Sequence, residues 1–319
     1  MTDISFIIPA LDEELYIGAC LESVHAFAPK GKTYEILVGD NGSTDSTALI
    51  VEDFAQRTPD VAVTLHDLTG RSVGGVRNLL AKEASGAYYV FLDADTRVTE
   101  EWSVFVSSLL ERPHTSFIAG SRVVSPPEDK NNYLWQHWFR YLEGNKPPGS
   151  YINSGHMIVP AHVFNALGGF DHNLPTGEDV DICRRAVAHG YMLFIHPELL
   201  VYHTGFPQKV KGFFRRELWH GVGDFLTLDT FFDSPPAKAG LAYTLWLLLG
   251  PALLLFNPLL VVPWAGFLIL VPVGVSFAKE PMLTVRERIH HAYLTSVYLL
   301  ARGMSFLYRN ETRRFVDYR

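Results

Sequence analysis

The sequence predicts an α/β fold, in which a mainly parallel sheet is flanked by helices and a hydrophobic helical hairpin follows towards the C-terminus. Short apolar runs of strand length predict the sheet, helical candidates between them predict the flanking layers, and a long uncharged stretch predicts the hairpin. The chain has 319 residues, 48% of them hydrophobic, which is enough for one large core or two smaller ones.

Strands and helices alternate in the first hundred residues. Three apolar runs have the length and composition of buried strands, and turn residues follow each of them. They are residues 4–8, 35–39 and 88–92. Helical candidates lie at about residues 15–27 and 46–57, and the second has a candidate cap within Ser43, Thr44 and Asp45. This alternation predicts parallel strands whose carboxyl ends carry the ligand-binding residues.

Residues 239–278 form an uncharged stretch, because these forty positions contain no Asp, Glu, Lys, Arg or His. As one helix the stretch would be about 60 Å long, or roughly two hydrocarbon cores of a bilayer at ~30 Å each. Asn257 and Pro258 near its middle disfavour a continuous helix. The stretch therefore predicts two transmembrane segments joined by a tight turn, or a re-entrant hairpin. A buried hairpin of a soluble protein is the alternative, and the lack of charge favours the membrane.

The segments around this hairpin differ in composition. An amphipathic juxtamembrane segment at residues 209–238 precedes it, and a basic, amphipathic helical tail at residues 279–319 follows it. The tail has eight Lys or Arg residues against four acids, which predicts a cytoplasmic location by the positive-inside rule. Within it, residues 293–308 are expected either to lie in the membrane interface or to pack on the protein. The N-terminus lacks the basic start of a signal peptide, so we expect the first domain to face the cytoplasm from the inner membrane, after an even number of crossings.

Composition and motifs argue against several classes of protein. The net charge of −7 gives no basic footprint, so no nucleic-acid partner is expected. Cys20 and Cys183 form neither a CxxC pair nor a disulfide framework, and we expect both to be packing residues. No GxGxxG motif follows the first strand, which argues against a dinucleotide-dependent dehydrogenase.

Asp93 and Asp95 directly follow the third strand-like run. The i, i+2 spacing of an extended chain points both carboxylates to one side. Two such hard oxygen ligands can hold Mg²⁺ or Mn²⁺, and the ion can neutralise a diphosphate. An isolated Asp-x-Asp pair is more often a solvated turn, so the weight of this pair comes from the motifs around it.

Five ordered segments, covering roughly residues 3–205, give the chain a family resemblance. They are FIIPALDEE at residues 6–14, VGDNGSTD at 38–45, GGVRN at 74–78, FLDAD at 91–95, and GGFD at 168–171 leading to GED at 177–179. The set resembles the family 2 inverting glycosyltransferases of the GT-A fold. The resemblance implies a GT-A catalytic domain over residues 1–208. Members usually have Asn where this chain has Asp12 and a second Asp where it has Asn41, and both exchanges are near-isosteric.

The resemblance also implies a donor site. Its nucleoside pocket would be lined by Pro9, Ala10, Asp12 and Glu13. Asp40 would bond the base, and Asp93 and Ala94 would contact the nucleotide-sugar. Arg77 would lie against the nucleotide or its phosphates, and a fixed guanidinium suits a phosphate well. The alternative for Arg77 is an ordinary arginine on a helix surface.

The acidic pair Glu178 and Asp179 matches the family's catalytic carboxylates, with Asp179 at the position of the general base. An inverting transfer needs one carboxylate to take the acceptor proton as that oxygen attacks the anomeric carbon. A leaving-group acid is not required, because the metal and Arg77 can stabilise the departing diphosphate. The alternative is that both acids simply favour the N-terminus of a helix over residues 180–189.

Three further positions are candidates for binding. His203 follows a strand-like stretch and resembles a histidine that completes the metal site in some GT-A enzymes, although a structural role is equally compatible with the sequence. Trp138 lies in the aromatic segment 133–141, which suits sugars, lipids or core packing. Arg215 and Arg216 resemble basic residues before the membrane region of relatives, where they would bind lipid or acceptor phosphate, or simply anchor the domain.

The leading hypothesis is a metal-dependent inverting transfer of one sugar from a nucleotide-diphosphate sugar, with UDP expected. The hairpin predicts a membrane-associated acceptor such as a lipid-linked glycan or polyprenyl phosphate. Two crossings are too few to enclose a polymer channel, which argues against a processive synthase. A non-catalytic membrane scaffold of an assembly complex is the alternative. The sequence does not determine the oligomeric state.

Overall fold

The computed structural model describes residues 2–111, 116–129, 131–140, 151–174 and 176–308. The chain divides into two compact units. The sheet unit comprises Met1–Lys130 and Glu143–Gly205, and the helical unit comprises Asn131–Leu142 and Phe206–Arg319.

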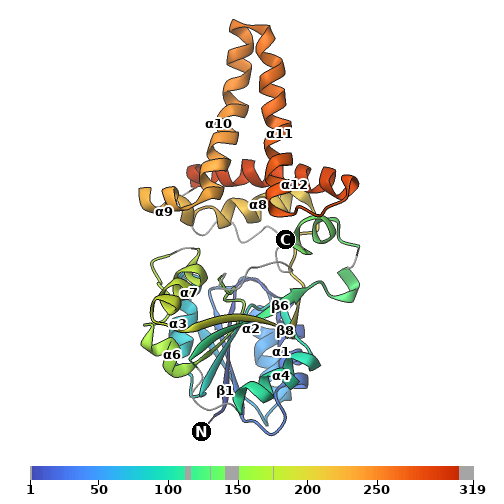
Figure 1. Ribbon diagram of the computed structural model, residues 1–319. Helices are drawn as coiled ribbons and strands as arrows, with labels where there is room; N and C mark the ends of the chain where they lie inside the picture. Colours follow the sequence, from blue (N-terminus) through green and yellow to red (C-terminus); the bar gives the residue numbers. More distant parts are fainter. Residues whose placement is uncertain (1, 112–115, 130, 141–150, 175, 309–319) are drawn as a thin grey trace. The chain divides into compact units, whose positions relative to one another are not determined.

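The described part of the sheet unit contains one eight-stranded sheet, with strand order β3-β2-β1-β4-β7-β6-β8-β5 (Figure 1). The strands are β1 Ile4–Ala10, β2 Tyr34–Asp40, β3 Ala62–Asp67, β4 Tyr88–Leu92, β5 Thr96–Val98, β6 Phe117–Val124, β7 His156–Pro160 and β8 Met192–His203. β1 pairs in parallel with β2 and β4, and β2 with β3. β7 is antiparallel to β4 and β6, and β5 is antiparallel to β8, so the sheet is mixed beyond its parallel half.

Helices cover the two faces of this sheet (Figure 1). They are α1 Ile17–Phe27, α2 Thr47–Arg57, α3 Val73–Glu83, α4 Glu100–Leu110, α6 Ala161–Ala166 and α7 Glu178–Ala188, with the short helix η1 Pro127–Asp129. The Ser72 side chain caps α3 by accepting a hydrogen bond from the Gly75 amide. Ser46 directly precedes α2, and its side chain makes no capping bond. Asp45, in the segment expected to cap the helix, accepts from the amide and hydroxyl of Thr47, the first helical residue.

The core of the sheet unit lies on both faces of the parallel strands. Phe91 contacts the rings of Phe164 and Phe170 on one face, with centroids 5.1 Å apart in each pair. Phe6 packs 6.0 Å from Trp102 on the other face. The predicted buried parallel strands are therefore confirmed. Both cysteines are free and buried, as a packing role predicts.

The helical unit consists of a long hairpin and shorter helices that lie across its base (Figure 1). Its helices are η2 Trp135–Phe139, α8 Val210–His220, η3 Gly223–Phe225, α9 Leu228–Asp233, α10 Pro235–Phe256, η4 Pro258–Leu260, α11 Val261–Lys279, α12 Val285–Met304 and η5 Ser305–Tyr308. The segments Pro235–Phe256 and Pro258–Lys279 are each long and apolar enough to cross a membrane. The expected break is confirmed, because α10 ends at Phe256 and Asn257 caps the next turn through the Leu259 amide.

Side chains join the two helices of the hairpin. The indole of Trp246 donates to the carbonyl of Trp264 (3.2 Å), and the indole of Trp264 donates to the carbonyl of Trp246 (3.1 Å). Pro272 has no N–H with which to reach the Leu268 carbonyl one turn earlier, and the Tyr243 hydroxyl donates to that carbonyl (3.1 Å). The hairpin is thus held by directed bonds as well as by packing.

α12 packs along the base of the hairpin. A capping box of Thr284 and Glu287 starts the helix, and the hydrogen bonds from Thr284 lower the pKa of Glu287 to about 2. Leu294 and Leu299 are buried, whereas Ile289 and Tyr293 are exposed. Residues 293–308 therefore pack on the protein along one side and keep an open side.

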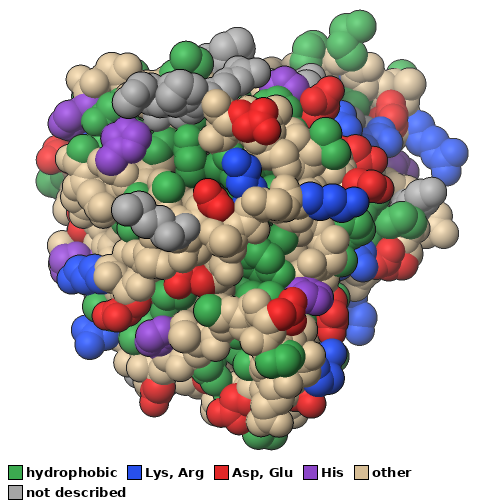
Figure 2. All heavy atoms as spheres, turned by 90° about the horizontal axis from the view of Figure 1, so that it is seen from below, with side chains coloured by type: hydrophobic (Ala, Val, Ile, Leu, Met, Phe, Trp, Pro, Cys, Tyr) green, Lys and Arg blue, Asp and Glu red, His purple; other side chains and the backbone are tan. Residues whose placement is uncertain are grey.

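Charges are mixed over the surface. On the face drawn in Figure 2, acidic, basic and hydrophobic side chains of the described residues are interspersed. The net charge of −7 is therefore not gathered there into one acidic field.

Candidate active site

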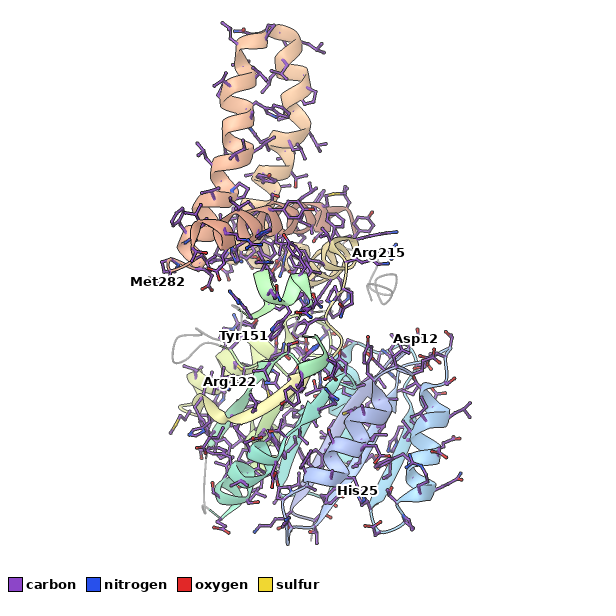
Figure 3. The ribbon with its side chains drawn as sticks, turned by 90° about the vertical axis from the view of Figure 1, so that its right-hand side faces the viewer. Asp12, His25, Arg122, Tyr151, Arg215 and Met282 are labelled. Carbon is purple, nitrogen blue, oxygen red and sulfur yellow. The ribbon has the colours of Figure 1, made fainter. Side chains whose placement is uncertain are left out.

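The candidate site begins at the carboxyl ends of β1 and β2. Asp12 follows β1 and lies at the opposite end of the sheet unit from His25 (Figure 3). Its φ of 53° is left-handed, a conformation that Asp and Asn tolerate better than most residues. Its carboxylate accepts from the Thr44 amide (2.8 Å), and Asp40 accepts from the amide and hydroxyl of Ser43. The Asp12–Thr44 bond joins the two loops that follow β1 and β2, and the Asp40–Ser43 bonds order the second loop.

The remaining residues of the predicted nucleoside pocket lie on the same loops. Pro9 and the buried Ala10 end β1. The amide of Glu13 donates to the Thr47 hydroxyl (2.7 Å). Asn41 departs from the family pattern, and its amide group accepts from the Gly70 and Arg71 amides and donates to the Arg71 carbonyl. An aspartate could not make the last of these bonds, so Asn41 fits its surroundings.

Asp93, Asp95 and His203 form a cluster that can hold a metal ion. Each offers one ligand atom, and these atoms lie within 4.8 Å of one another. Asp93 follows β4 directly, and Asp95 precedes β5 with the buried Ala94 between them. The pairing of β5 with β8 places Thr96 opposite His203, which brings the imidazole to 3.6 Å from Asp95. Two carboxylates and one imidazole form a donor set that fits Mn²⁺, while an all-oxygen set would suit Mg²⁺ better.

Two glycines give the carboxylates room. A Cβ on Gly155 would overlap Oδ2 of Asp93, and a Cβ on Gly205 would overlap Oδ2 of Asp95. The Asp93 amide also donates to the Gly155 carbonyl (2.9 Å). Neither glycine was predicted from the sequence as part of the site. The only signal was that Gly155 stands beside β7 and Gly205 directly follows the stretch that contains His203.

Arg77 lies between two carboxylates. Its guanidinium donates to Asp93 (2.6 Å) and to Glu178 (2.9 Å), and its side chain is 3% exposed. The alternative of a surface arginine is therefore wrong. Arg77 therefore bridges Asp93 at the end of β4 and Glu178 at the start of α7.

Glu178 and Asp179 begin α7 but have different surroundings. Glu178 is buried and accepts from Arg77 and from the hydroxyl of Ser154 (2.9 Å). Asp179 is half-buried beside it. The helix therefore starts two residues earlier than expected, and the structure brings Glu178 to Arg77 and Asp93. Ser154 is a further contact of Glu178 that local sequence patterns do not indicate.

The helical unit places the other three candidates. Trp138 is 1% exposed and stacks on His291 with ring centroids 5.1 Å apart, so core packing replaces the predicted acceptor contact. Arg216 forms an ion pair with Glu217 (2.6 Å), and its guanidinium lies 5.0 Å from the Phe139 ring. Arg215 is half-buried on α8 (Figure 3).

Sequence comparison assigns this site to a family. Residues 5–165 match the profile of glycosyl transferase family 2, and residues 88–304 match that of glycosyl transferase family group 2. The chain belongs to glycosyl transferase family 2. It is accordingly a glycosyltransferase with a GT-A-like fold, which confirms the expected family and fold.

Two curated relatives of this family 2 glycosyltransferase cover most of its length. It is 26% identical to Glycosyltransferase AglE of Haloferax volcanii over 252 residues, which are 77% of this chain and 80% of that protein. It is 23% identical to a dolichyl N-acetyl-alpha-D-glucosaminyl phosphate 3-beta-D-2,3-diacetamido-2,3-dideoxy-beta-D-glucuronosyltransferase of Methanococcus voltae, over 72% of this chain and 74% of that protein. Other curated relatives are longer, and the chain spans 40% of their length.

A solved structure has the same fold. Mannosyltransferase PcManGT from Pyrobaculum calidifontis, in complex with GDP-Man and Mn²⁺, superposes with a TM-score of 0.60 over 97% of this chain and 88% of that chain. The two sequences are 19% identical, so the likeness concerns the fold alone.

Proposed function

We propose that this family 2 glycosyltransferase is a metal-dependent inverting enzyme that moves one sugar from a nucleotide-diphosphate sugar to a membrane-associated acceptor. The observation that carries the proposal is the cluster of Asp93, Asp95 and His203 at the end of β4, with ligand atoms within 4.8 Å of one another. A non-catalytic scaffold would need neither this cluster nor the acidic start of α7.

The donor would bind where the loops after β1 and β2 are joined. Pro9, Ala10, Asp12, Glu13 and Asp40 would line the nucleoside pocket. Asp12 and Asp40 are already fixed by hydrogen bonds from Thr44 and Ser43, so little ordering is needed on binding. We expect UDP as the nucleotide of the donor. GDP is the alternative, because the solved structure of similar fold holds GDP-Man.

The diphosphate would meet a metal ion held by Asp93, Asp95 and His203. A divalent ion there would neutralise the charge that develops on the leaving diphosphate. The nitrogen ligand favours Mn²⁺ over Mg²⁺, which takes oxygen ligands. Ala94 and Asp93 would contact the nucleotide-sugar from the same turn.

Asp179 would act as the general base. It is half-buried and accepts from the Val180 amide (2.8 Å), and Glu178 beside it is buried and accepts from Arg77 and Ser154. An acceptor hydroxyl must lose its proton as it attacks, but a phosphate oxygen is already anionic and needs no base. A base at this position therefore favours the hydroxyl of a lipid-linked glycan over polyprenyl phosphate.

The membrane part of the proposal rests on the hairpin. Each candidate span has 22 residues, which as a helix measures about 33 Å against a hydrocarbon core of ~30 Å. By the positive-inside rule, the basic tail would put the ends of the hairpin on the cytoplasmic side of the inner membrane. Arg215 and Arg216 would stand near lipid phosphates. One curated relative acts, by its name, on a dolichyl-linked sugar.

Replacing Asp95 with Asn tests the proposal, because it removes one ligand charge without a change of size. In the wild type, Mn²⁺ with UDP or GDP should raise Tm, since a ligand at 100 times its Kd stabilises by about 2.7 kcal/mol. Asp95→Asn should lose that shift and lower donor hydrolysis at least about 100-fold. Asp60→Asn, at an exposed turn, is the matched control. Full activity of Asp95→Asn, or of the wild type in excess EDTA, would refute the proposal.

A further inference from the structure

Arg77 and Glu178 form the centre of a buried polar network, and we infer that both are positioning residues. In this assignment Arg77 does not bind the donor diphosphate and Glu178 is not the base. Together with Ser154 they hold Asp93 of the metal cluster and the start of α7 at a fixed distance, so that Asp179 faces the reacting atoms. The inference rests on the proposed function and specifies how its two halves are joined.

The guanidinium of Arg77 is enclosed by the protein. Both carboxylate contacts are within hydrogen-bonding distance, at 2.6 Å to Asp93 and 2.9 Å to Glu178. The side chain is 3% exposed, and its guanidinium lies 5.8 Å from the ring of Phe170. A phosphate has no surface of this guanidinium on which to form a bidentate contact. The charge of Arg77 is therefore paired with two carboxylates of the protein itself.

Glu178 is a buried carboxylate that is paired with Arg77. Its side chain is 8% exposed, and a buried carboxylate is tolerated only with a cation and hydrogen bonds around it. One of its oxygens accepts from Arg77 and also from Ser154, both at 2.9 Å. Its burial and its ion pair with Arg77 hold this carboxylate inside the protein, away from an acceptor hydroxyl. This arrangement leaves the base role to Asp179.

Glu178 and Asp179 are neighbours in the first turn of α7, so the contacts of one constrain the other. The residue before α7 is Gly177, with φ of 84°, and it has no side chain with which to cap the helix. The side chain of Glu178 instead ties the first turn to α3 through Arg77. Gly74 on α3 lies beside this contact, and an added Cβ there would meet Phe170 at 3.2 Å, closer than an ordinary van der Waals contact. The direction of Asp179, the next residue, follows from this attachment.

A second bridge runs parallel to Arg77. Ser154 binds Glu178 through its hydroxyl, and Gly155, the next residue, accepts from the amide of Asp93 at 2.9 Å. The Asp93-to-Glu178 distance is therefore set twice, once by a side chain and once by a two-residue stretch of backbone. Two independent connections hold the metal ligand Asp93 and the start of α7 at a fixed separation, as a site that positions a metal ion and a base requires.

The test separates donor binding from turnover. Binding is measured with UDP and GDP in Mn²⁺, and turnover as nucleoside diphosphate released by hydrolysis of UDP-glucose, UDP-N-acetylglucosamine or GDP-mannose. Arg77→Lys supplies the charge but cannot span two carboxylates, so kcat should fall about 10- to 100-fold with Kd changed less than about threefold. Ser154→Ala should lower kcat several-fold with Kd unchanged. A tenfold or greater rise in Kd for Arg77→Lys would overturn the inference.

Glu178→Gln against Asp179→Asn provides the second arm. A glutamine keeps an oxygen that accepts from Arg77 and Ser154, so Glu178→Gln should lose less than about tenfold in kcat, while Asp179→Asn should lose at least about 1000-fold. Loss of turnover in Glu178→Gln equal to that in Asp179→Asn would refute the assignment. If Arg77→Lys fails to fold, Glu178→Gln and Ser154→Ala decide.

Arg185→Lys is the matched control. Arg185 also ties α7 to a loop, through the carbonyls of Leu167 and Gly169, but at the other end of the helix. It should lower Tm and leave kcat and Kd unchanged, and a kcat loss like that of Arg77→Lys would contradict a specific role for Arg77. A wild type that neither binds a nucleotide in Mn²⁺ nor hydrolyses any of the three donors would instead refute the proposed function itself.

Discussion

Gly155 and Gly205 stand where the two carboxylates of the metal cluster need room. Gly155 directly precedes β7, which pairs with β4 beside Asp93. Gly205 follows β8, which pairs with β5 beside Asp95. A methyl group at either position would overlap a carboxylate oxygen. Such positions affect chemistry without contacting a ligand, because they decide where a ligating oxygen can lie.

We therefore expect Gly205→Ala to displace Asp95 and lower Mn²⁺ affinity about 10- to 100-fold, as changes around metal ligands usually do. Mn²⁺ titration followed by electron paramagnetic resonance measures this. Gly18→Ala in α1 is the control, since its added Cβ would lie 3.4 Å from Ile50, an ordinary contact. Unchanged Mn²⁺ affinity in Gly205→Ala would mean that Asp95 is not a ligand or that its loop yields freely.

The sequence could predict the cluster but not its supports. Asp93, Asp95 and His203 all follow strand-like runs, and strand ends of one sheet edge lie close together. The partners of Arg77 are 16 and 101 residues away, and they meet through sheet pairing and the approach of α7 to α3. Local patterns carry no information about such distant pairs, so Arg77 was expected to face phosphate.

At the scale of elements, α11 and α12 meet through a buried polar junction. The carbonyl of Ser276, in the last turn of α11, accepts from the amide of Glu280 (3.0 Å). Arg288 on α12 adds a donor to the same carbonyl (2.7 Å) and donates to that of Pro281 (3.1 Å). His291, one turn later, bonds the Ser276 hydroxyl at 2.8 Å. The end of α11 is therefore bonded to another helix.

This junction predicts a pH dependence. Burial lowers the pKa of His291 from 6.5 to about 4, with the charges of Lys279 and Arg288 adding to the effect. The stability that depends on neutral His291 is complete above pH 6.5 and is lost as pH falls towards 4, because the unfolded chain takes the proton first. The slope is up to about 1.4 kcal/mol per pH unit. Tm in detergent between pH 7.5 and 4.5 should fall more steeply for the wild type than for His291→Gln, and parallel curves would contradict this.

The elements themselves were largely predictable. The strands β1, β2 and β4 and the break between α10 and α11 follow from apolar runs bounded by turn residues. The antiparallel pairings of β7 and β5 were not predicted, because an apolar run such as β7 has no local signal for its direction. The capping bond of α2 comes from Asp45, within the segment predicted for it, because its carboxylate accepts from the amide of Thr47 at the helix start.

At the scale of the whole molecule, the proposed topology places both ends of the hairpin on one side of the membrane. Leu259 is exposed at the hairpin tip, and Met282 is exposed at its base. The native cysteines are buried, so a single added cysteine reports its own position. The spans are long enough to carry the tip across the bilayer.

We expect a membrane-impermeant maleimide to label Leu259→Cys in intact cells and to label Met282→Cys only in inverted membrane vesicles. Met282→Cys is the matched control, because it tests whether the vesicles are sealed and oriented. Labelling of Leu259→Cys from the cytoplasmic side only would favour a re-entrant hairpin over two crossings.

The reciprocal bonds between Trp246 and Trp264 bear on how the protein is made. Each indole N–H finds its acceptor on the other helix, and lipid offers no substitute acceptor. A first helix released alone into the bilayer would carry an unsatisfied donor until the second arrived. Biosynthesis therefore gains if the insertion machinery retains α10 until α11 has emerged and releases the two as a folded pair.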